Sequence, residues 1–399
     1  MPERGRGGAR LSPDARRILI AQGLRAFVYG LGSVLIGVSL ARQGLSGIEV
    51  GVLLAALLAG AALVSIALAR YADRVGRRRC YRVLLAGMAV AGTAFAVTDW
   101  LPALMLAALT GTVSTEVVES GPFTSLEQAM LPSTVDPNDT ARIFGTYNTI
   151  ATLAGSLGAL AAGVPALLDV APQRLLLAYP VAVALALVAI RGLSRTVEAE
   201  GAREHGAAEP SLRRSQRIVG RLLFALDSLG GGFVTQAFIA YVFTRKYGAR
   251  PETLGAVFFA IGILQAVSFQ AAVRLAHRIG LLRTMVFTHL PSNLLLAAIA
   301  LAPTLAAAIA LLLARSLLSQ MDVPTRQAYV VAVVDPSERT PAAAYTNTAR
   351  YVVRPFAPPL AGAALQVALG APFVIAGILK RAYDIGLYAL FRKVAVDER

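Results

Sequence analysis

Long apolar segments recur along the whole chain and are separated by short polar loops. A helix needs roughly 20 apolar residues to cross about 30 Å of hydrocarbon. Segments of this kind lie near residues 17–41, 47–70, 81–99, 102–130, 141–168, 173–192, 217–244, 252–275, 281–301, 304–331, 341–367 and 370–391. The pattern predicts an all-α membrane protein with 12 transmembrane helices.

A polar stretch divides these helices into two groups of six. Residues 194–216 have no apolar periodicity, which is typical of a linker. The expected parts are a disordered cytoplasmic tail at 1–16, a six-helix half at 17–193, a cytoplasmic linker at 194–216, a second six-helix half at 217–391 and a cytoplasmic tail at 392–399.

Basic residues are unevenly divided between the loops on the two sides. One side carries Arg74, Arg77, Arg78, Arg79, Arg195, Arg203, Arg213, Arg214, Arg274, Arg278 and Arg283. Cytoplasmic loops of membrane proteins are enriched in Lys and Arg. We therefore expect both termini in the cytoplasm and the chain in the inner (plasma) membrane of the cell. Arg245 and Lys246, with Arg250, are an exception on the opposite side.

Composition excludes several other classes of protein. The 399 residues are 56% hydrophobic and 15% charged, which argues against a soluble enzyme. A net charge of +15 can indicate nucleic-acid binding, but these arginines cluster in short loops, so no nucleic-acid partner is expected. Cys80 is the single cysteine and the three histidines are scattered, so we expect no metal site and no cofactor. The sequence also lacks a phosphate-binding loop for ATP.

The two halves are related by an internal repeat. At an offset of 199 residues, Val135-Asp136-Pro137 aligns with Val334-Asp335-Pro336, and Asn148 aligns with Asn347. At an offset of 204, the loop from Ala72 to Gly76 aligns with the loop from Ala276 to Gly280. Two copies of a six-helix unit explain these matches.

The loop after the second predicted helix carries a distinctive motif. Its sequence Asp73-Arg74-x-Gly76-Arg77-Arg78 resembles the corresponding loop of major facilitator superfamily transporters. The resemblance implies two parallel six-helix halves that rock about a substrate held near the midplane. It also implies a monomer surrounded by membrane lipid. The second copy departs from the motif, because His277 stands where the first copy has Asp73.

The resemblance further implies that charges at helix ends hold the gates rather than the cargo. The candidates for gating are Asp73, Arg74, Gly76, Arg77, Glu127, Asp322 and Arg326.

Charged residues inside the predicted helices are the natural candidates for a binding site, because lipid makes them costly unless they are paired or face water. Arg25 and Asp227 lie at similar depths in the first and seventh helices. They are placed so that they could pair across the cavity, and our hypothesis is that both line it, with cargo or a proton competing for one of them. The alternative is a permanent salt bridge between the two helices.

Glu116 and Glu119 lie on one face of the fourth predicted helix, since they are three residues apart. Burial favours the protonated form of a carboxyl group. Glu116, Glu119 and Asp227 are therefore our candidates for proton coupling. The alternative is that one or both glutamates pair with Arg315 or Arg25.

The remaining substrate-binding candidates come mainly from the second half. Arg350 and Arg354 align with small residues of the first half, which suggests a role particular to one cargo. Fixed ion pairs, or side chains that reach the interface, are the alternative. The full set of substrate-binding candidates is Arg25, Tyr29, Asn148, Asp227, Asn347, Arg350 and Arg354. Lys380 and Asp384, four residues apart, are expected to pair with each other.

These features predict a secondary transporter that moves a small-molecule substrate by alternating access. We expect proton coupling through the buried carboxyl groups. If any of these acids is protonated, the intramembrane arginines outnumber the remaining negative charges, which favours an anionic or carboxylate-bearing cargo. The alternatives are a broad-specificity exporter of drugs or amphiphiles that exchanges them for protons, and a membrane solute sensor that does not transport. A membrane enzyme is disfavoured, because no constellation of catalytic residues is visible.

Overall fold

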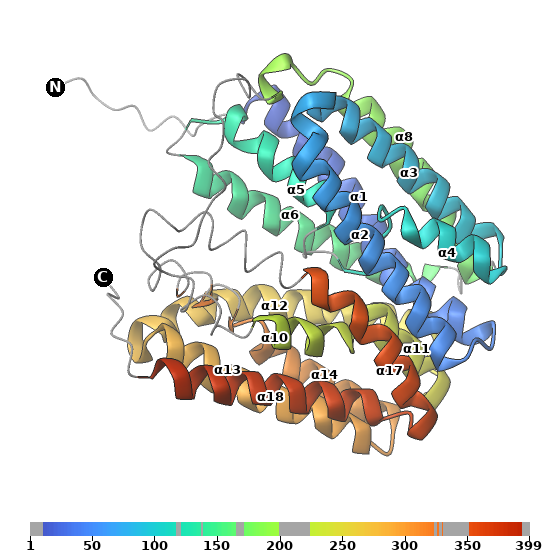
Figure 1. The fold of residues 1–399 in the computed structure, drawn as a ribbon, viewed down its shortest axis with the longest axis vertical. Helices are drawn as coiled ribbons and strands as arrows, with labels where there is room; N and C mark the ends of the chain where they lie inside the picture. The colour runs from blue at the N-terminus through green and yellow to red at the C-terminus, as the bar shows by residue number, and fades with distance from the viewer. Residues whose placement is uncertain are drawn as a thin grey trace.

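The computed structural model describes most of the chain as two helical bundles (Figure 1). The described residues are 11–116, 121–136, 139–164, 171–198, 224–322, 325–326, 329 and 351–392. Helices make up nearly all of these residues, and none of them forms a strand.

The first bundle contains the helices up to residue 198. These are α1 (Pro13–Arg42), α2 (Gly47–Val75), α3 (Arg77–Val97), α4 (Leu101–Leu109), α5 (Pro122–Met130), α6 (Thr140–Ala161) and α8 (Ala178–Ile190), with 3-10 helices η1 (Leu131–Thr134), η3 (Pro172–Leu177) and η4 (Arg195–Val197).

The second bundle contains the helices from residue 224 onward. These are α10 (Phe224–Gly232), α11 (Gln236–Tyr247), α12 (Pro251–Ile279), α13 (Leu281–Ala298), α14 (Leu305–Ser319), α17 (Ala357–Val367) and α18 (Ala371–Phe391), with 3-10 helices η5 (Ile299–Leu301) and η7 (Arg354–Phe356). The predicted linker lies outside the described residues beyond residue 198.

Local signals in the sequence explain where several helices begin. Ser12 caps α1, which starts at Pro13, four residues before the predicted first span. Ser46 and Glu49 form a reciprocal capping box at the start of α2. Thr235 caps α11 through the backbone N–H of Phe238. Each cap satisfies N–H groups that the first turn of a helix leaves without a partner.

The repeat predicted from the sequence is visible in the backbone. Gly76 joins α2 to α3 with φ of 100°, and Gly280 joins α12 to α13 with φ of 87°. Residues with a side chain rarely adopt these angles, so glycine is needed at both positions. The two loops therefore turn in the same way despite the change from Asp73 to His277.

Two spans predicted as continuous helices are broken. The fourth span, 102–130, forms α4 and α5, and the described part of the interval between them is not helical. The seventh span, 217–244, is interrupted between α10 and α11, directly after the Gly230–Gly232 run. Such breaks free backbone groups for other partners, and they are tolerated where the backbone lines a cavity.

The two bundles meet closely at the end away from the chain termini (Figure 1). There α1 packs on α11, α2 on α17 and α6 on α12. A Cβ added to Gly37 would lie 2.2 Å from the carbonyl oxygen of Ala237, and one added to Gly51 would lie 2.3 Å from that of Pro358. Glycines thus allow backbone to touch backbone and seal this end.

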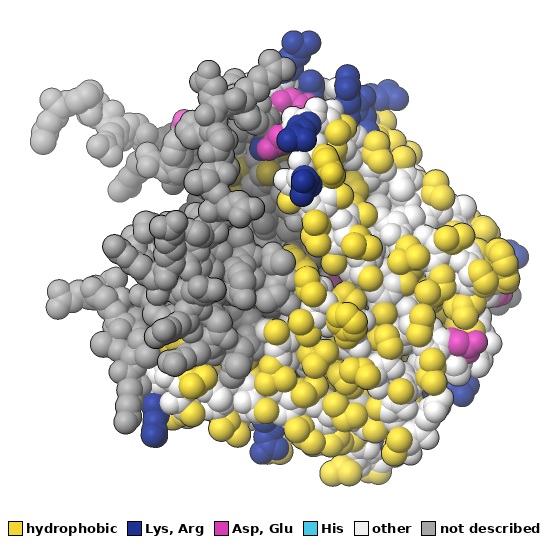
Figure 2. All heavy atoms as spheres, viewed as in Figure 1, with side chains coloured by type: hydrophobic (Ala, Val, Ile, Leu, Met, Phe, Trp, Pro, Cys, Tyr) yellow, Lys and Arg dark blue, Asp and Glu magenta, His cyan; other side chains and the backbone are white. Residues whose placement is uncertain are grey.

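The outer surface has the character expected of a protein in lipid. Figure 2 shows hydrophobic side chains spread across one face, with Lys and Arg gathered near its edges. Exposed apolar residues include Val83 and Val90 of α3 and Val181 of α8. Among the described residues, six helical segments are long and apolar enough to span a membrane. The chain is a multi-pass membrane protein.

Candidate functional site

A small cavity of about 40 Å³ lies where the broken fourth span faces the second bundle. Its lining combines an apolar wall with polar and charged groups. The described lining residues come from α1 (Arg25, Tyr29), α2 (Leu57, Leu58, Ala61), the break (Gly111, Val113, Ser114, Thr115, Glu116, Gly121), the start of α5 (Pro122, Phe123, Thr124) and η7 (Arg354).

The break beside the cavity is held open by specific contacts. Gly111 has φ of 65°, and a Cβ there would lie 2.4 Å from backbone atoms of Gly60 on α2. The hydroxyl of Tyr29 donates a hydrogen bond of 2.7 Å to the carbonyl oxygen of Thr112. The non-helical backbone thus accepts a hydrogen bond from α1 and packs closely against α2.

An ion pair joins the two bundles at this cavity. Arg354 Nη2 of η7 lies 2.5 Å from both carboxylate oxygens of Glu116. Gly232 of α10 leaves room for this arginine, because a Cβ there would lie 2.8 Å from the carbonyl oxygen of Arg354. Two predicted site residues are therefore in contact, although Glu116 pairs with neither Arg315 nor Arg25 as the alternative supposed.

Arg25 belongs to a buried network inside the first bundle. Its Nη2 lies 2.5 Å from Glu127 Oε2 and 3.1 Å from the hydroxyl of Tyr147. The hydroxyls of Tyr147 and Tyr81 both donate to Glu127, at 2.5 and 2.6 Å. Glu127 is fully buried, and three helices supply its partners.

The expected pairing of Arg25 with Asp227 across the cavity is wrong. Arg25 finds its carboxylate on α5, while Asp227 pairs within the second bundle. Asp227 Oδ1 accepts from Lys380 Nζ at 2.8 Å, and its Oδ2 accepts from Arg326 at 3.1 Å. Arg25 and Asp227 each find their partners within their own bundle, so these contacts do not join the two bundles.

The contacts of Lys380 and Asp384 also differ from the expectation. Lys380 turns to Asp227 instead of Asp384. Asp384 accepts hydrogen bonds from Asn293 Nδ2 at 2.9 Å and lies 2.8 Å from His289 Nδ1. The i, i+4 spacing made a pair possible, but partners on neighbouring helices compete successfully in a bundle interior.

The predicted gate residues of the second half lie at the edge of the same network. Arg326 donates to Asp322 at 3.2 Å as well as to Asp227. All three side chains are buried. These charges connect the end of the tenth predicted span to α10 and α18.

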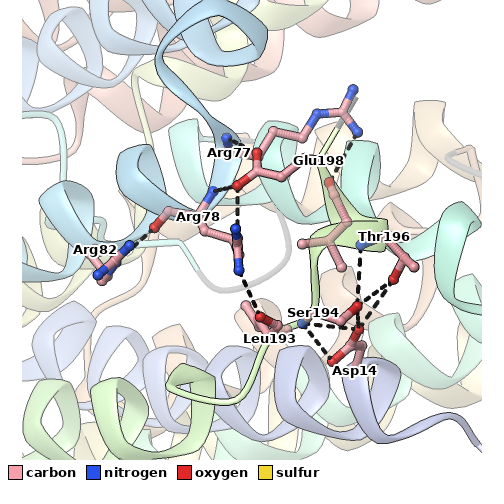
Figure 3. A network of polar contacts seen from close by, with 9 residues as sticks. Asp14, Arg77, Arg78, Arg82, Leu193, Ser194, Thr196 and Glu198 are labelled. Carbon is pink, nitrogen blue, oxygen red and sulfur yellow. Dashed lines mark hydrogen bonds and ion pairs between the residues drawn. The ribbon is translucent and has the colours of Figure 1, made fainter. Parts of the chain in front are cut away.

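The loop that carries the motif, from Asp73 to Arg78, takes part in a second polar network, in which Arg77 and Arg78 contact Glu198 (Figure 3). Asp73 pairs with Arg77 at 2.7 Å, and Arg77 Nη1 donates to the carbonyl oxygen of Ala129 at 2.8 Å. Glu198 accepts from the backbone N–H of Arg77 at 2.6 Å and from Arg78 Nε at 2.8 Å. The loop is thereby fixed to α5 and to the segment after α8. Arg74 is exposed.

Glu198 lies outside the membrane-spanning helices. Burial alone would raise the pKa of Glu198, but hydrogen bonds from Arg78 and from the backbone of Arg77 outweigh it and lower the pKa below the ordinary 4.5. Glu198 is therefore held ionised near neutral pH.

The other candidates are not part of the cavity as described. Asn148 is exposed on α6 and is not among the described lining residues. Glu119, Asn347 and Arg350 lie outside the described residues.

Several partners were missed by the sequence reasoning. In the sequence, Tyr81 and Tyr147 are not distinguished from ordinary core aromatic residues. Glu198 lies within the predicted linker, 194–216. Glu127 lies in an apolar segment, and a glutamate buried there needs several hydrogen-bond donors. That requirement points to tyrosines on neighbouring helices.

Two helical bundles with a charged cavity between them are the architecture of a membrane transporter. A sequence model described as Major Facilitator Superfamily matches residues 18–358. The chain belongs to this superfamily.

Known proteins agree with this assignment. The chain is 25% identical, over 95% of its length and 94% of the relative's, to an uncharacterized membrane protein of Saccharomyces cerevisiae, YJR124C. Its fold is similar to that of the nucleoside transporter NupG, with a TM-score of 0.77, 13% identity and coverage of 95% of this chain and 99% of the other. A D-xylose–proton symporter gives a TM-score of 0.71 at 14% identity, covering 94% and 97%. At such low identity, these two structures establish the fold alone.

Proposed function

We propose that this protein is a proton-coupled secondary transporter of a small anionic, carboxylate-bearing solute. It would reside in the inner membrane of the cell with both termini in the cytoplasm, and it would act as a monomer. The ion pair between Glu116 and Arg354 carries the proposal, because it joins the two bundles and lines the cavity.

The pair supplies a physical route from proton binding to movement. Glu116 and Arg354 are both partly buried, and removing one charge of such a pair weakens the contact between the bundles. A proton on Glu116 neutralises one member, and an anionic solute can then neutralise Arg354. Proton and solute together thus replace a contact between the halves, and alternating access requires such contacts to be made and broken.

Solute uptake into proteoliposomes tests the proposal. A panel of carboxylates, neutral sugars and amphiphilic cations is offered with an acidic exterior, and protein-free liposomes measure leak. The expected result is accumulation of one or more carboxylates that collapses when the pH gradient is removed. Accumulation of cations or neutral solutes alone would contradict the anionic preference, and binding without flux would favour the sensor.

Substitutions test Arg25 and Glu116 separately. The double variant Arg25→Gln/Glu127→Gln removes a cavity cation together with its buried partner charge, and it is expected to abolish uptake while folded protein remains in the membrane. Glu116→Gln is expected to bind solute but to lose its response to an imposed pH gradient. Retained gradient-driven uptake by this variant would exclude Glu116 as the coupling residue.

A further inference from the structure

A histidine, an asparagine and an aspartate form a buried polar cluster inside the second bundle. His289 and Asn293 lie one turn apart on α13, and both contact Asp384 of α18. Their exposed fractions are 2%, 0% and 0%, in that order. None of the three is among the described residues that line the cavity between the bundles. Ionisable residues inside membrane helices are rare and commonly functional, so this cluster is a candidate for a role of its own.

The geometry of the cluster determines which nitrogen of His289 carries a hydrogen. Asp384 Oδ2 accepts a hydrogen bond of 2.9 Å from Asn293 Nδ2, and Asp384 Oδ1 lies 2.8 Å from His289 Nδ1. An ionised carboxylate can only accept hydrogen bonds, so Nδ1 is the donor in this arrangement. The neutral ring then has an unprotonated Nε2, and none of the described residues makes a hydrogen bond to that nitrogen.

The charged and titratable groups around His289 come from α13 itself and from the helices that pack on α13 and α18. The ring of Tyr383 packs edge-on against the imidazole, with 6.4 Å between the centroids. On α14, the carbonyl oxygen of Arg315 accepts a hydrogen bond from Ser292 of α13. The described groups are Lys380, Tyr383 and Asp384 of α18, Asp227 of α10, Arg315, Asp322 and Arg326 of the tenth predicted span, and the exposed Arg274, His277, Arg278 and Arg283 near the junction of α12 and α13. Of these, Asp384 makes the hydrogen bond to the ring.

A proton on Nε2 turns the cluster into a charge pair. Histidine is the side chain whose ordinary charge change falls between about pH 5 and pH 8. A carboxylate at hydrogen-bond distance favours the charged ring, and burial opposes it. With the proton, Asp384 is bonded to a cation; without it, Asp384 is bonded to two neutral donors, His289 and Asn293. The occupancy of Nε2 therefore changes how strongly Asp384 attracts other cations.

Lys380 is the cation placed to respond to this change. It lies four residues from Asp384 on α18, a spacing at which two side chains can meet, but its Nζ contacts Asp227 Oδ1 of α10 at 2.8 Å instead. The side chain of Lys380 crosses the glycine run of α10. A Cβ added to Gly230 would lie 2.8 Å from Lys380 Cγ, and one added to Gly231 would lie 3.9 Å from its Nζ. Lys380 thus has two carboxylates within reach, and its contact with Asp227 joins α10 to α18.

We infer that His289 Nε2 is a proton-binding site inside the second bundle, and that its occupancy selects the partner of Lys380. With the proton bound, the imidazolium neutralises Asp384 and Lys380 stays on Asp227. Without the proton, Asp384 attracts Lys380 along α18, and α10 loses this contact beside the break in the seventh span. The second bundle thereby carries a pH-sensitive contact that is separate from the cavity. The inference involves no solute and no flux, so it can fail or hold independently of the proposed function.

Nuclear magnetic resonance of the full-length protein with ¹⁵N-labelled histidine tests the proton site. His205 and His277 are the other histidines of the chain, and the variant His205→Gln/His277→Gln leaves the signals of His289 alone. Above about pH 8, these signals are expected to show a protonated Nδ1 and an unprotonated Nε2. Acidification is expected to protonate Nε2. Asp384→Asn, added to this variant, keeps an acceptor for Nδ1 but removes the charge, and it should lower the midpoint of the titration by about one pH unit or more.

Labelling lysine with ¹⁵N tests the exchange of partners. The chain has three lysines, Lys246, Lys380 and Lys393, and Lys380→Arg identifies the Lys380 signal by its loss. The Lys380 Nζ signal is expected to shift with pH at the midpoint of the His289 titration, and to lose this shift in His289→Gln. Lys246 is the matched control, since its Nζ donates to the carbonyl oxygens of Ala300 and Ala302 and contacts neither carboxylate. Its signal should stay unchanged over the same range.

Three results would overturn the inference. They are a hydrogen on Nε2 instead of Nδ1 at alkaline pH, His289 signals that do not change between about pH 5 and pH 8, and a Lys380 signal that does not follow the His289 titration. The first two are read from the protein with an intact Asp384, so they decide the matter even where Asp384→Asn fails to fold. Coupled titration of His289 and Lys380 would support the inference whether or not the protein moves a carboxylate.

Discussion

The buried charges of this protein are arranged mainly as local pairs. Arg25 and Glu127 are 4% and 0% exposed, and two tyrosine hydroxyls complete the coordination of the glutamate. An ionised side chain without a partner is very costly in this environment. Such a pair therefore fixes the relative positions of α1, α3, α5 and α6.

Glu127→Gln tests this account by leaving the guanidinium of Arg25 buried beside a neutral amide. Loss of one partner of a buried pair costs about 3–5 kcal/mol, so the thermal unfolding midpoint is expected to fall steeply. Tyr147→Phe removes a single hydrogen bond and should cost only about 1 kcal/mol. The double variant Arg25→Gln/Glu127→Gln should be more stable than Glu127→Gln alone. A double variant as unstable as the sum of the two single variants would show that the residues do not act as a pair.

Which charges lie inside the membrane could be predicted from the sequence, but which charges pair could not. Periodicity and hydropathy place Arg25, Asp227 and Lys380 along their helices. Pairing depends on how the helices are rotated about their axes, and a rotation of one residue position turns a side chain by about 100°. Glu116 and Arg354 were both identified as candidates, yet nothing in the sequence brought them together.

At the scale of single elements, the broken fourth span matters most for the site. In a continuous helix over 102–130, the backbone N–H and C=O groups would be hydrogen-bonded to one another. No helix N-terminus would then face the cavity, as that of α5 does. Pro122 and Gly121 mark the break in the sequence, and proline is well tolerated in the first turn of a helix. Those residues could be read as a kink, but the length of the interruption was not predictable.

Gly111→Ala tests whether the break is needed. Gly111 has a φ of 65°, which disfavours a side chain. An added Cβ would also lie only 2.4 Å from the backbone of Gly60. The variant is expected to lose at least about 1 kcal/mol of stability and to lose carboxylate uptake. Gly145→Ala is the matched control, since it lies in α6 with no atom within 4 Å of an added Cβ. Equal midpoints for the two variants would contradict the account.

The network around Glu198 predicts a dependence of stability on pH. Because the pKa of Glu198 is lowered in the folded protein, its contribution is present above the ordinary pKa of 4.5 and is lost as the pH falls through the folded value. The unfolding midpoint of the wild type should therefore fall between about pH 6 and pH 3 by more than that of Glu198→Gln. Parallel curves for the two proteins would show that the carboxylate does not stabilise the motif loop.

At the scale of the whole molecule, the two bundles are sealed by backbone contacts at one end, and the ion pair between Glu116 and Arg354 joins them at the cavity. The glycines at the seal, including Gly47, Gly51 and Gly362, make the contact close without charged groups that would need to be desolvated. The repeat and the two-bundle architecture were predictable from sequence offsets. The position of the seal was not, because it depends on glycines from both halves meeting in space.

A reversible cross-link at the sealed end tests the central claim, that transport requires the two bundles to separate there. A Cβ built on Gly47 lies 2.9 Å from Leu365 Cβ, so the two helices must move apart by about 1 Å to reach the roughly 3.8 Å of a disulfide. The variant Gly47→Cys/Leu365→Cys is made with Cys80→Ser, and Gly47→Cys with Cys80→Ser is the control. Uptake of the carboxylate that accumulates most in proteoliposomes is measured before oxidation, after it and after reduction. Uptake is predicted to stop in the oxidised double variant alone and to return on reduction, whereas full uptake by the cross-linked protein would contradict the account.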